Sequence, residues 1–99
     1  MNNKHFTIIT FYQFKKNNNI DKIKIELKNF CSFHKIRGTI LIANEGINGT
    51  LASSEQSIKL LRKELKKLGF KNLEEKKSYY QFMPFNRLKI KMKKEIVTF

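Results

Sequence analysis

The heptapeptide Asn44–Thr50, with the sequence NEGINGT, has the residue types of a functional loop. Two of the chain's four glycines lie in it, and an apolar run precedes it. A phosphate-binding P-loop places glycines and a lysine directly before a helix, where backbone N–H groups and the helix dipole meet the anion. This heptapeptide has no lysine, and its glycines lie between two strand-like runs. The sequence therefore argues against a P-loop.

A tight turn explains most of the same heptapeptide. Asn48-Gly49 is the strongest short signal for a two-residue β-hairpin, because a type I′ turn needs positive φ at both central residues. We therefore predict the turn at these two residues. A turn does not require the acid Glu45 beside Gly46, nor an apolar residue, Ile47, at its tip. An exposed Ile47 would suit docking, so a plain turn and a docking turn both stay open.

The C-terminal segment carries the only patterned charge in the chain. Arg87, Lys89, Lys91 and Lys93 alternate with apolar residues, so a β-strand would place four cations on one face. Other lysines lie nearby in sequence: Lys76, Lys77 and Lys94. The segment is either a solvated edge strand, whose lysines guard against aggregation, or a track for the phosphate backbone of a nucleic acid.

Cys31 and His34 are three residues apart and could in principle form a nucleophile with its base. On a helix, however, both fall near an apolar stripe, and a buried thiol has a raised pKa and is inert. We predict core packing for Cys31 and a half-buried position at a helix end for His34. The sequence alone does not identify a partner for His5, and its single cysteine excludes a cysteine cluster for zinc. We expect neither a metal nor a cofactor.

Length and composition indicate one domain, residues 1–99, with enough apolar residues for a single core. The formal net charge of +13 favours polyanionic partners, with nucleic acid first, although part of this charge is general lysine richness. No run of about 18 apolar residues suggests a membrane span, and the N-terminus does not read as a signal peptide. A single cysteine excludes an internal disulfide, so we expect a cytoplasmic protein.

Alternation and helical spacing divide the chain into seven elements. Ser53 is the expected N-cap of the second helix and Gly69 its C-terminal stop. The predicted strands are 5–14, 39–43, 50–52, 72–82 and 87–93, and the predicted helices are 20–35 and 54–68. This order predicts an α+β, ferredoxin-like or acylphosphatase-like βαββαβ sandwich. We expect an antiparallel sheet with two helices on one face, plus a C-terminal strand or extended arm.

Two functions that share this topology are disfavoured by the residues. An acylphosphatase holds phosphate with an arginine and backbone amides after its first strand, but Lys15–Asn19 has neither arginine nor glycine. An RNA-recognition motif needs aromatic residues after a basic residue and glycine on a central strand. Arg37-Gly38 is followed instead by Thr, Ile and Leu.

Four stretches together resemble the N-terminal region of the rhodanese-like tRNA uridine hydroxylases. They are FYQF (11–14), RGTILIANEGINGTLA (37–52), EKKS (75–78) and MPFNRLKIKMKKEIVTF (83–99), so the resemblance spans nearly the whole chain. The family motifs fall on Glu45, Gly46, Ile47, Asn48, Gly49, Pro84, Phe85, Arg87, Lys94 and Glu95.

The resemblance implies an acylphosphatase-like domain that precedes a rhodanese domain with an active-site cysteine. The whole enzyme would add an oxygen-dependent hydroxyl at C5 of the wobble uridine of tRNA. Cys31 lies outside the motif of the catalytic cysteine, and the chain ends at Phe99. We therefore expect an excised domain or a truncated product that does not catalyse the reaction alone.

Two hypotheses follow. In the first, the chain is an accessory domain that contacts the anticodon region of tRNA through its basic strand. It would dock on the rhodanese domain, of the same or a neighbouring polypeptide, through the EGING loop and residues 84–95. In the second, it is a protein-interaction domain that docks the rhodanese-like partner without touching RNA.

Overall fold

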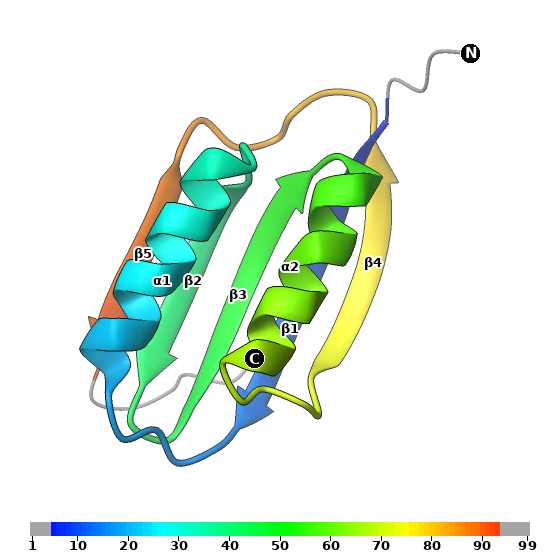
Figure 1. The fold of residues 1–99 in the computed structure, drawn as a ribbon. Helices are drawn as coiled ribbons and strands as arrows, with labels where there is room; N and C mark the ends of the chain where they lie inside the picture. Colours follow the sequence, from blue (N-terminus) through cyan, green and yellow to red (C-terminus); the bar gives the residue numbers. More distant parts are fainter. Residues whose placement is uncertain (1–4, 94–99) are drawn as a thin grey trace.

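Seven elements follow one another in the order that the sequence predicts, and they form an α+β fold (Figure 1). The computed structural model describes residues 5–93 of the chain. The elements are β1 (Phe6–Phe14), α1 (Ile20–Phe33), β2 (Arg37–Ala43), β3 (Gly46–Ser53), α2 (Glu55–Lys67), β4 (Glu74–Tyr80) and β5 (Leu88–Lys93).

The strands form one sheet in the order β4-β1-β3-β2-β5. The first four strands pair antiparallel, which confirms the ferredoxin-like arrangement. β5 instead pairs parallel with β2, so the five-stranded sheet is mixed. The reason is the connection: β4 ends where β2 begins, and residues 81–87 cross that end of the sheet to the opposite edge (Figure 1). The predicted C-terminal strand is thus part of the sheet.

Both helices cover one face of the sheet (Figure 1), and the core lies between the two layers. The predicted helical stripes are confirmed, since their central residues are buried. Those residues are Ile23, Leu27 and Cys31 on α1, and Ile58, Leu61 and Leu65 on α2. From the sheet, alternate residues such as Ile9, Phe11, Ile40, Ile47 and Leu51 complete the core. We call the opposite side of the sheet the open face.

Local hydrogen bonds fix the helix ends. Asn19 caps α1, where its side-chain oxygen accepts from the N–H of Lys22 at 3.1 Å. The prediction of Ser53 as the cap of α2 is wrong by one residue: Ser53 still pairs with Thr7 in the sheet, and Ser54 is the cap. Gly69 terminates α2 as predicted, with a φ of +104°.

The prediction of a turn at Asn48-Gly49 is wrong. β2 and β3 are joined by a two-residue turn at Asn44 and Glu45, and Ala43 pairs with Gly46. Neither turn residue has positive φ, since Lys35 is the one non-glycine with positive φ among residues 5–93. Extending β3 back to Gly46 lets it pair with β1 along its whole length, which a turn at Asn48-Gly49 would prevent.

Candidate nucleic-acid interface

Three lysines of β5 form a column on the open face. Leu88 and Ile90 are partly buried against the core, whereas Lys89, Lys91 and Lys93 alternate with them and are exposed. Alternate residues of a strand are about 6.6 Å apart, so the ammonium groups follow the edge of the sheet at regular spacing. We call these three residues the lysine column. A row of cations along an exposed edge can contact successive phosphates of a nucleic acid.

Arg87 lies immediately before β5 and is exposed. Its carbonyl oxygen accepts a hydrogen bond from the N–H of Gly38 at 3.1 Å, which anchors the start of the strand beside β2. The predicted strand of four cations is therefore a strand of three lysines preceded by the arginine. Lys94 and Glu95 lie outside the described residues.

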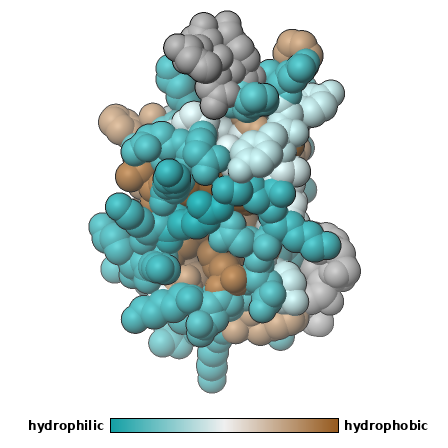
Figure 2. Space-filling model, turned by 90° about the vertical axis from the view of Figure 1, so that its right-hand side faces the viewer, coloured by the Kyte–Doolittle hydropathy of each residue, from teal (hydrophilic) through white to brown (hydrophobic). Residues whose placement is uncertain are grey.

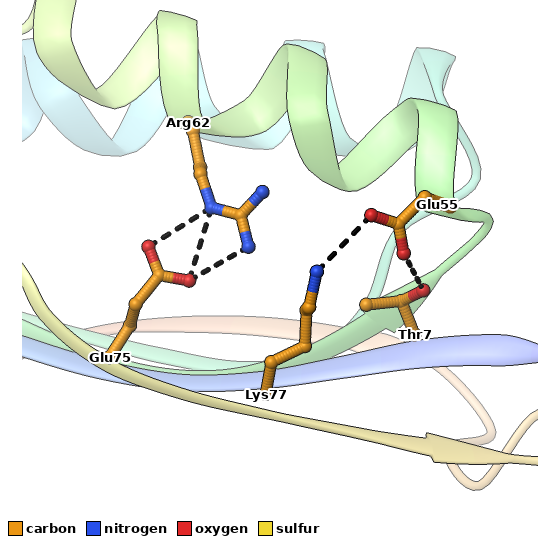
Figure 3. Close-up of polar contacts among 5 residues, drawn as sticks. All are labelled: Thr7, Glu55, Arg62, Glu75 and Lys77. Carbon is orange, nitrogen blue, oxygen red and sulfur yellow. Dashed lines mark hydrogen bonds and ion pairs between the residues drawn. The ribbon is translucent and has the colours of Figure 1, made fainter.

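Lys76 and Lys77 lie on β4, at the opposite edge of the sheet from the lysine column. Lys76 pairs with Thr10 in the register and faces the open side. Lys77 turns to the helix side, where its Nζ lies 3.3 Å from a carboxylate oxygen of Glu55 (Figure 3). Three strands separate β4 from β5, so the structure does not bring these two lysines to the lysine column.

A polar layer joins α2 to β4 (Figure 3). Arg62 donates to both carboxylate oxygens of Glu75, with the closest contact at 2.9 Å. Beside this pair, the Thr7 hydroxyl donates to Glu55 at 2.7 Å. The hydrogen bond from Thr7, together with Lys77, holds the pKa of Glu55 below its ordinary value. These charged side chains pair with one another within the domain, so they do not form part of the candidate interface.

The side of the molecule that carries β4 is mostly hydrophilic (Figure 2), and every residue of β4 is exposed. Charged side chains along an edge strand discourage pairing with another chain. Both edges of the sheet thus carry lysines. Only β5 presents them as a single-face column uninterrupted by acids, because β4 carries Glu74 and Glu75 beside its lysines.

The EGING motif is mainly a packing motif in this structure. Ile47 is fully buried, so the expectation of an exposed docking residue is wrong. A Cβ at Gly46 would lie 2.4 Å from the carbonyl oxygen of Gln13, and one at Gly49 would lie 2.9 Å from the Phe11 ring. Asn48 is buried as well. Of the motif residues Glu45–Gly49, only Glu45 is exposed.

The loop between β1 and α1 clamps the turn at Asn44 and Glu45. The Asn17 side-chain amide donates to the carbonyl oxygens of Ala43 at 2.7 Å and Gly46 at 3.2 Å. The N–H of Asn17 donates to the Asn44 carbonyl, and that of Lys15 to the Glu45 carbonyl. All four carbonyls of residues 43–46 are therefore held by one short segment. This loop packs on the hairpin, and it carries no arginine to hold a phosphate.

Two aromatic residues of β1 that were not among the predicted site residues are exposed. Tyr12 and Phe14 are 42% and 58% exposed, although β1 is a central strand. Their rings meet edge to face, with centroids 6.0 Å apart. The alternation of β1 was the available signal, because it places both residues on the face away from Ile9 and Phe11. The register places these residues in one row across the end of the sheet. Phe14 of β1 pairs with Gly46 of β3, Gly46 pairs with Ala43 of β2, and Ala43 pairs with Lys93 of β5.

The other predicted positions carry little chemistry. Pro84 and Phe85 lie in the connection between β4 and β5, with Pro84 exposed and Phe85 half-buried. Cys31 is buried as predicted, and burial, with a smaller contribution from Glu64, raises the pKa of its thiol to about 12. Within residues 5–93, no three His, Cys, Asp or Glu side chains gather to hold a metal ion, and no helix has the length and apolarity to span a membrane.

Comparison with family models and curated proteins gives a consistent result. A model described as "UPF0176 acylphosphatase like domain" matches residues 6–96. A tRNA uridine(34) hydroxylase of Teredinibacter turnerae is 43% identical over 94 residues, which are 94% of this chain and 29% of that protein. The protein of the same name from Pelagibacter ubique is 42% identical, over 93% of this chain and 31% of its own length. The chain thus spans about a third of the curated relatives that it matches.

Solved structures share the fold at low sequence identity. BlrP1 of Klebsiella pneumoniae, in a complex with calcium and cyclic diGMP, superimposes with a TM-score of 0.68 at 15% identity. The match covers 91% of this chain and 24% of that one. Full-length HypF, in its phosphate- and nucleotide-bound form, gives a TM-score of 0.59 at 12% identity, over 87% of this chain and 12% of HypF. At these identities the likeness concerns the fold alone.

Proposed function

The chain belongs to the family of UPF0176 acylphosphatase-like domains, and from this premise we propose that it is an accessory, RNA-contacting domain of a tRNA uridine hydroxylase. The names of its relatives, tRNA uridine(34) hydroxylases at about 40% identity, support the substrate class. In this proposal the oxygen-dependent hydroxylation uses reacting groups from the remaining two thirds of such an enzyme, and the domain acts in the cytoplasm. The chain alone binds tRNA without modifying it.

The observation that carries the RNA contact is the lysine column. Lys89, Lys91 and Lys93 are exposed on one face of an edge strand, and on the other face Leu88 and Ile90 pack on the core. Because the strand is also paired with β2, the backbone of the column loses little conformational freedom when it meets phosphates. Its cations have no acidic neighbours on the adjacent strand, where Thr39, Leu41 and Ala43 are the register partners. A formal net charge of +13 adds long-range attraction for tRNA.

Salt dependence tests this contact. We expect the triple variant Lys89→Gln, Lys91→Gln, Lys93→Gln to bind tRNA more weakly than the unaltered chain. Each lost phosphate contact should reduce the slope of log affinity against log salt by about 0.7–0.9, so the full effect would be roughly two units or more. Fluorescence titration with an anticodon stem-loop RNA at several salt concentrations measures both quantities.

A matched control keeps the change in net charge constant. Lys59, Lys63 and Lys66 are exposed on α2, which lies on the other side of the sheet from the open face. Their triple replacement by glutamine should leave the salt slope nearly unchanged. Equal slopes for the two triple variants would refute a localised contact, and absence of RNA binding by the unaltered chain would refute the proposed function.

A second candidate function is docking to a protein partner without RNA contact. Exposed aromatic residues at the end of β4 favour it: Tyr80 and Phe82 are 53% and 68% exposed, and their ring centroids are 6.3 Å apart. In this candidate function the partner would be the rhodanese domain that the family resemblance implies for such an enzyme. Calorimetric titration of the chain with the separately expressed remainder of the Pelagibacter ubique relative tests this. Binding that Phe82→Ala abolishes, with no affinity for RNA, would favour docking alone.

A further inference from the structure

An open hollow of about 540 Å³ lies at the end of the sheet where the β2–β3 turn meets the β1–α1 loop. It is lined by Phe14, Lys15, Lys16, Asn44 and Glu45. The hollow is shallow and open to solvent, so a ligand there would lie against the surface of the domain. The lining combines one aromatic ring, two ammonium groups, an amide and one carboxylate, that of Glu45, so its cations outnumber its acid. This combination fits a nucleotide, which offers a flat base, hydrogen-bonding edges and a phosphate.

The aromatic wall of the hollow is accessible. Phe14 is 58% exposed, and its register partner on β3 is Gly46, which has no side chain to cover the ring. On the other side of β1, the pairing with β4 ends at Tyr12 within the described residues. The Tyr12 and Phe14 rings meet edge to face, with a centroid distance of 6.0 Å and an interplanar angle of 71°. The exposed part of the Phe14 ring is available to a stacked base.

The backbone of the polar wall of the hollow is held in place before any ligand arrives. Asn44 belongs to the turn whose carbonyls are all fixed by the clamp of Lys15 and Asn17. A preorganised turn loses little entropy on binding. Lys15 is also restrained, since its Nζ lies 5.5 Å from the centroid of the Phe70 ring, whereas Lys16 is exposed. Lys16 is thus the better-placed cation for a phosphate.

The lysine column leads to this hollow. Lys93, the last residue of the column, is the register partner of Ala43, and Asn44 follows Ala43 directly. A strand of nucleic acid lying along Lys89, Lys91 and Lys93 would therefore reach the turn. The lysines of the column and of the hollow outnumber Glu45, the one acid in the lining, and this excess of positive charge favours a polyanion over a protein segment as the occupant.

We infer that the hollow binds one unpaired nucleotide. The base would stack on Phe14 with its hydrogen-bonding edge near the Asn44 amide, and the phosphate would lie near Lys16. The inference rests on the proposed RNA contact and adds to it a site that binds a base in addition to phosphate. Stacking accepts any base, because every base has a π face. The site would thus prefer single-stranded or looped RNA over a duplex, whose bases are already stacked.

The test compares two oligonucleotides of equal charge with the full chain. One is a fluorescein-labelled oligouridylate, and the other is the same phosphodiester backbone with abasic residues. We expect the oligouridylate to bind roughly 5- to 140-fold more tightly at the same salt concentration, the range for one stacked base. Phe14→Leu keeps an apolar side chain but removes the π face, so it should lose most of this preference. Phe14→Tyr should retain it.

The control is Phe33→Leu, since Phe33 is 81% exposed on α1 and faces no part of the hollow's lining. It should keep the full preference for the base-containing probe. Equal affinity of the unaltered chain for the two probes, or an undiminished preference in Phe14→Leu, would overturn the inferred site. If salt-dependent binding of both probes persists in that case, the proposed RNA contact still stands. If neither probe binds, both proposals fail.

Discussion

Replacing Asn17 by alanine should destabilise the domain, because one buried side chain secures the turn between β2 and β3. Asn17 is 5% exposed, and its amide donates to the carbonyls of Ala43 and Gly46. Each lost hydrogen bond takes a donor from a buried carbonyl oxygen and costs about 1–2 kcal/mol of stability, so the loss of both bonds costs about 2–4 kcal/mol. The side-chain oxygen of Asn17 is itself buried without a hydrogen-bond partner in the described structure. Its removal returns about 1 kcal/mol, so the net loss is about 1–3 kcal/mol.

Urea unfolding followed by far-UV circular dichroism measures this loss. For a domain of this size, a 2 kcal/mol loss also lowers Tm by roughly 8–16 °C. Asn18→Ala is the matched control, because Asn18 is the next residue in the same loop and is exposed. Its free energy of unfolding should stay within about 0.5 kcal/mol of the unaltered chain. If Asn17→Ala were as mild as this control, the clamp would not hold the turn.

An Asn17→Asp variant sharpens the same test through pH. The carboxyl would face two carbonyl oxygens in a buried position, so we expect burial to raise its pKa above the value in the unfolded chain. A group whose folded pKa is raised stabilises the fold below its unfolded pKa and loses that contribution as pH rises through the folded pKa. The variant should therefore be least stable at neutral pH and recover toward about pH 4. A stability that is independent of pH, relative to the unaltered chain, would refute the buried placement.

Three further experiments test separate features. Thr7→Val removes the hydroxyl that lowers the pKa of Glu55, so that pKa should rise toward its ordinary value in an NMR titration. Because the folded pKa of Glu55 is lowered, its contribution to stability is fully present above the unfolded pKa and is lost as pH falls through the folded pKa. The difference in free energy of unfolding between the variant and the unaltered chain should therefore disappear at low pH. An unchanged pKa of Glu55 in the variant would contradict the hydrogen bond. Burial raises the pKa of Cys31 to about 12, so a thiol reagent at about pH 8 should modify the native chain far more slowly than the urea-unfolded chain, and equal rates would argue for an exposed thiol. Lys35→Gly should raise the free energy of unfolding in urea by about 0.5–1 kcal/mol, because Lys35 has a φ of 57°, which glycine adopts without strain. Lys28→Gly within α1 should instead lower the free energy of unfolding by about 1 kcal/mol. A change of the same sign in both variants would refute backbone strain at Lys35.

The fold was predictable because each long element carries its own period. Helical spacing in α1 and α2 and alternation in β1 and β5 identified the elements without any long-range information. Gly69 was predicted correctly as the end of α2, because glycine readily adopts the positive φ that the chain needs there. The parallel pairing of β5 was not predictable in this way, because it depends on which edge of the sheet the connection at 81–87 reaches.

The predicted position of the turn was wrong for a different physical reason. Asn48-Gly49 is a strong local signal, but a turn there would leave only residues 50–53 of β3 to pair with β1 instead of all eight. The longer ladder and the burial of Ile47 outweigh the local preference. Gly46 and Gly49 are needed because other atoms approach them closely. A single sequence cannot distinguish a glycine kept for space from one kept for a turn.

The candidate site depends on this register more than on any one of its residues. Because strand side chains alternate with a period of two, a slip of one residue between β2 and β5 would turn the lysine column toward the helices. A slip between β1 and β3 would likewise move Phe14 to the helix side of the sheet. Gly46 and Gly49 permit the close approach of β1 and β3, and Ile47 anchors β3 in the core. The buried part of the EGING motif thus places Phe14, Asn44 and Lys93 at one end of the sheet, although none of its buried residues lines the hollow.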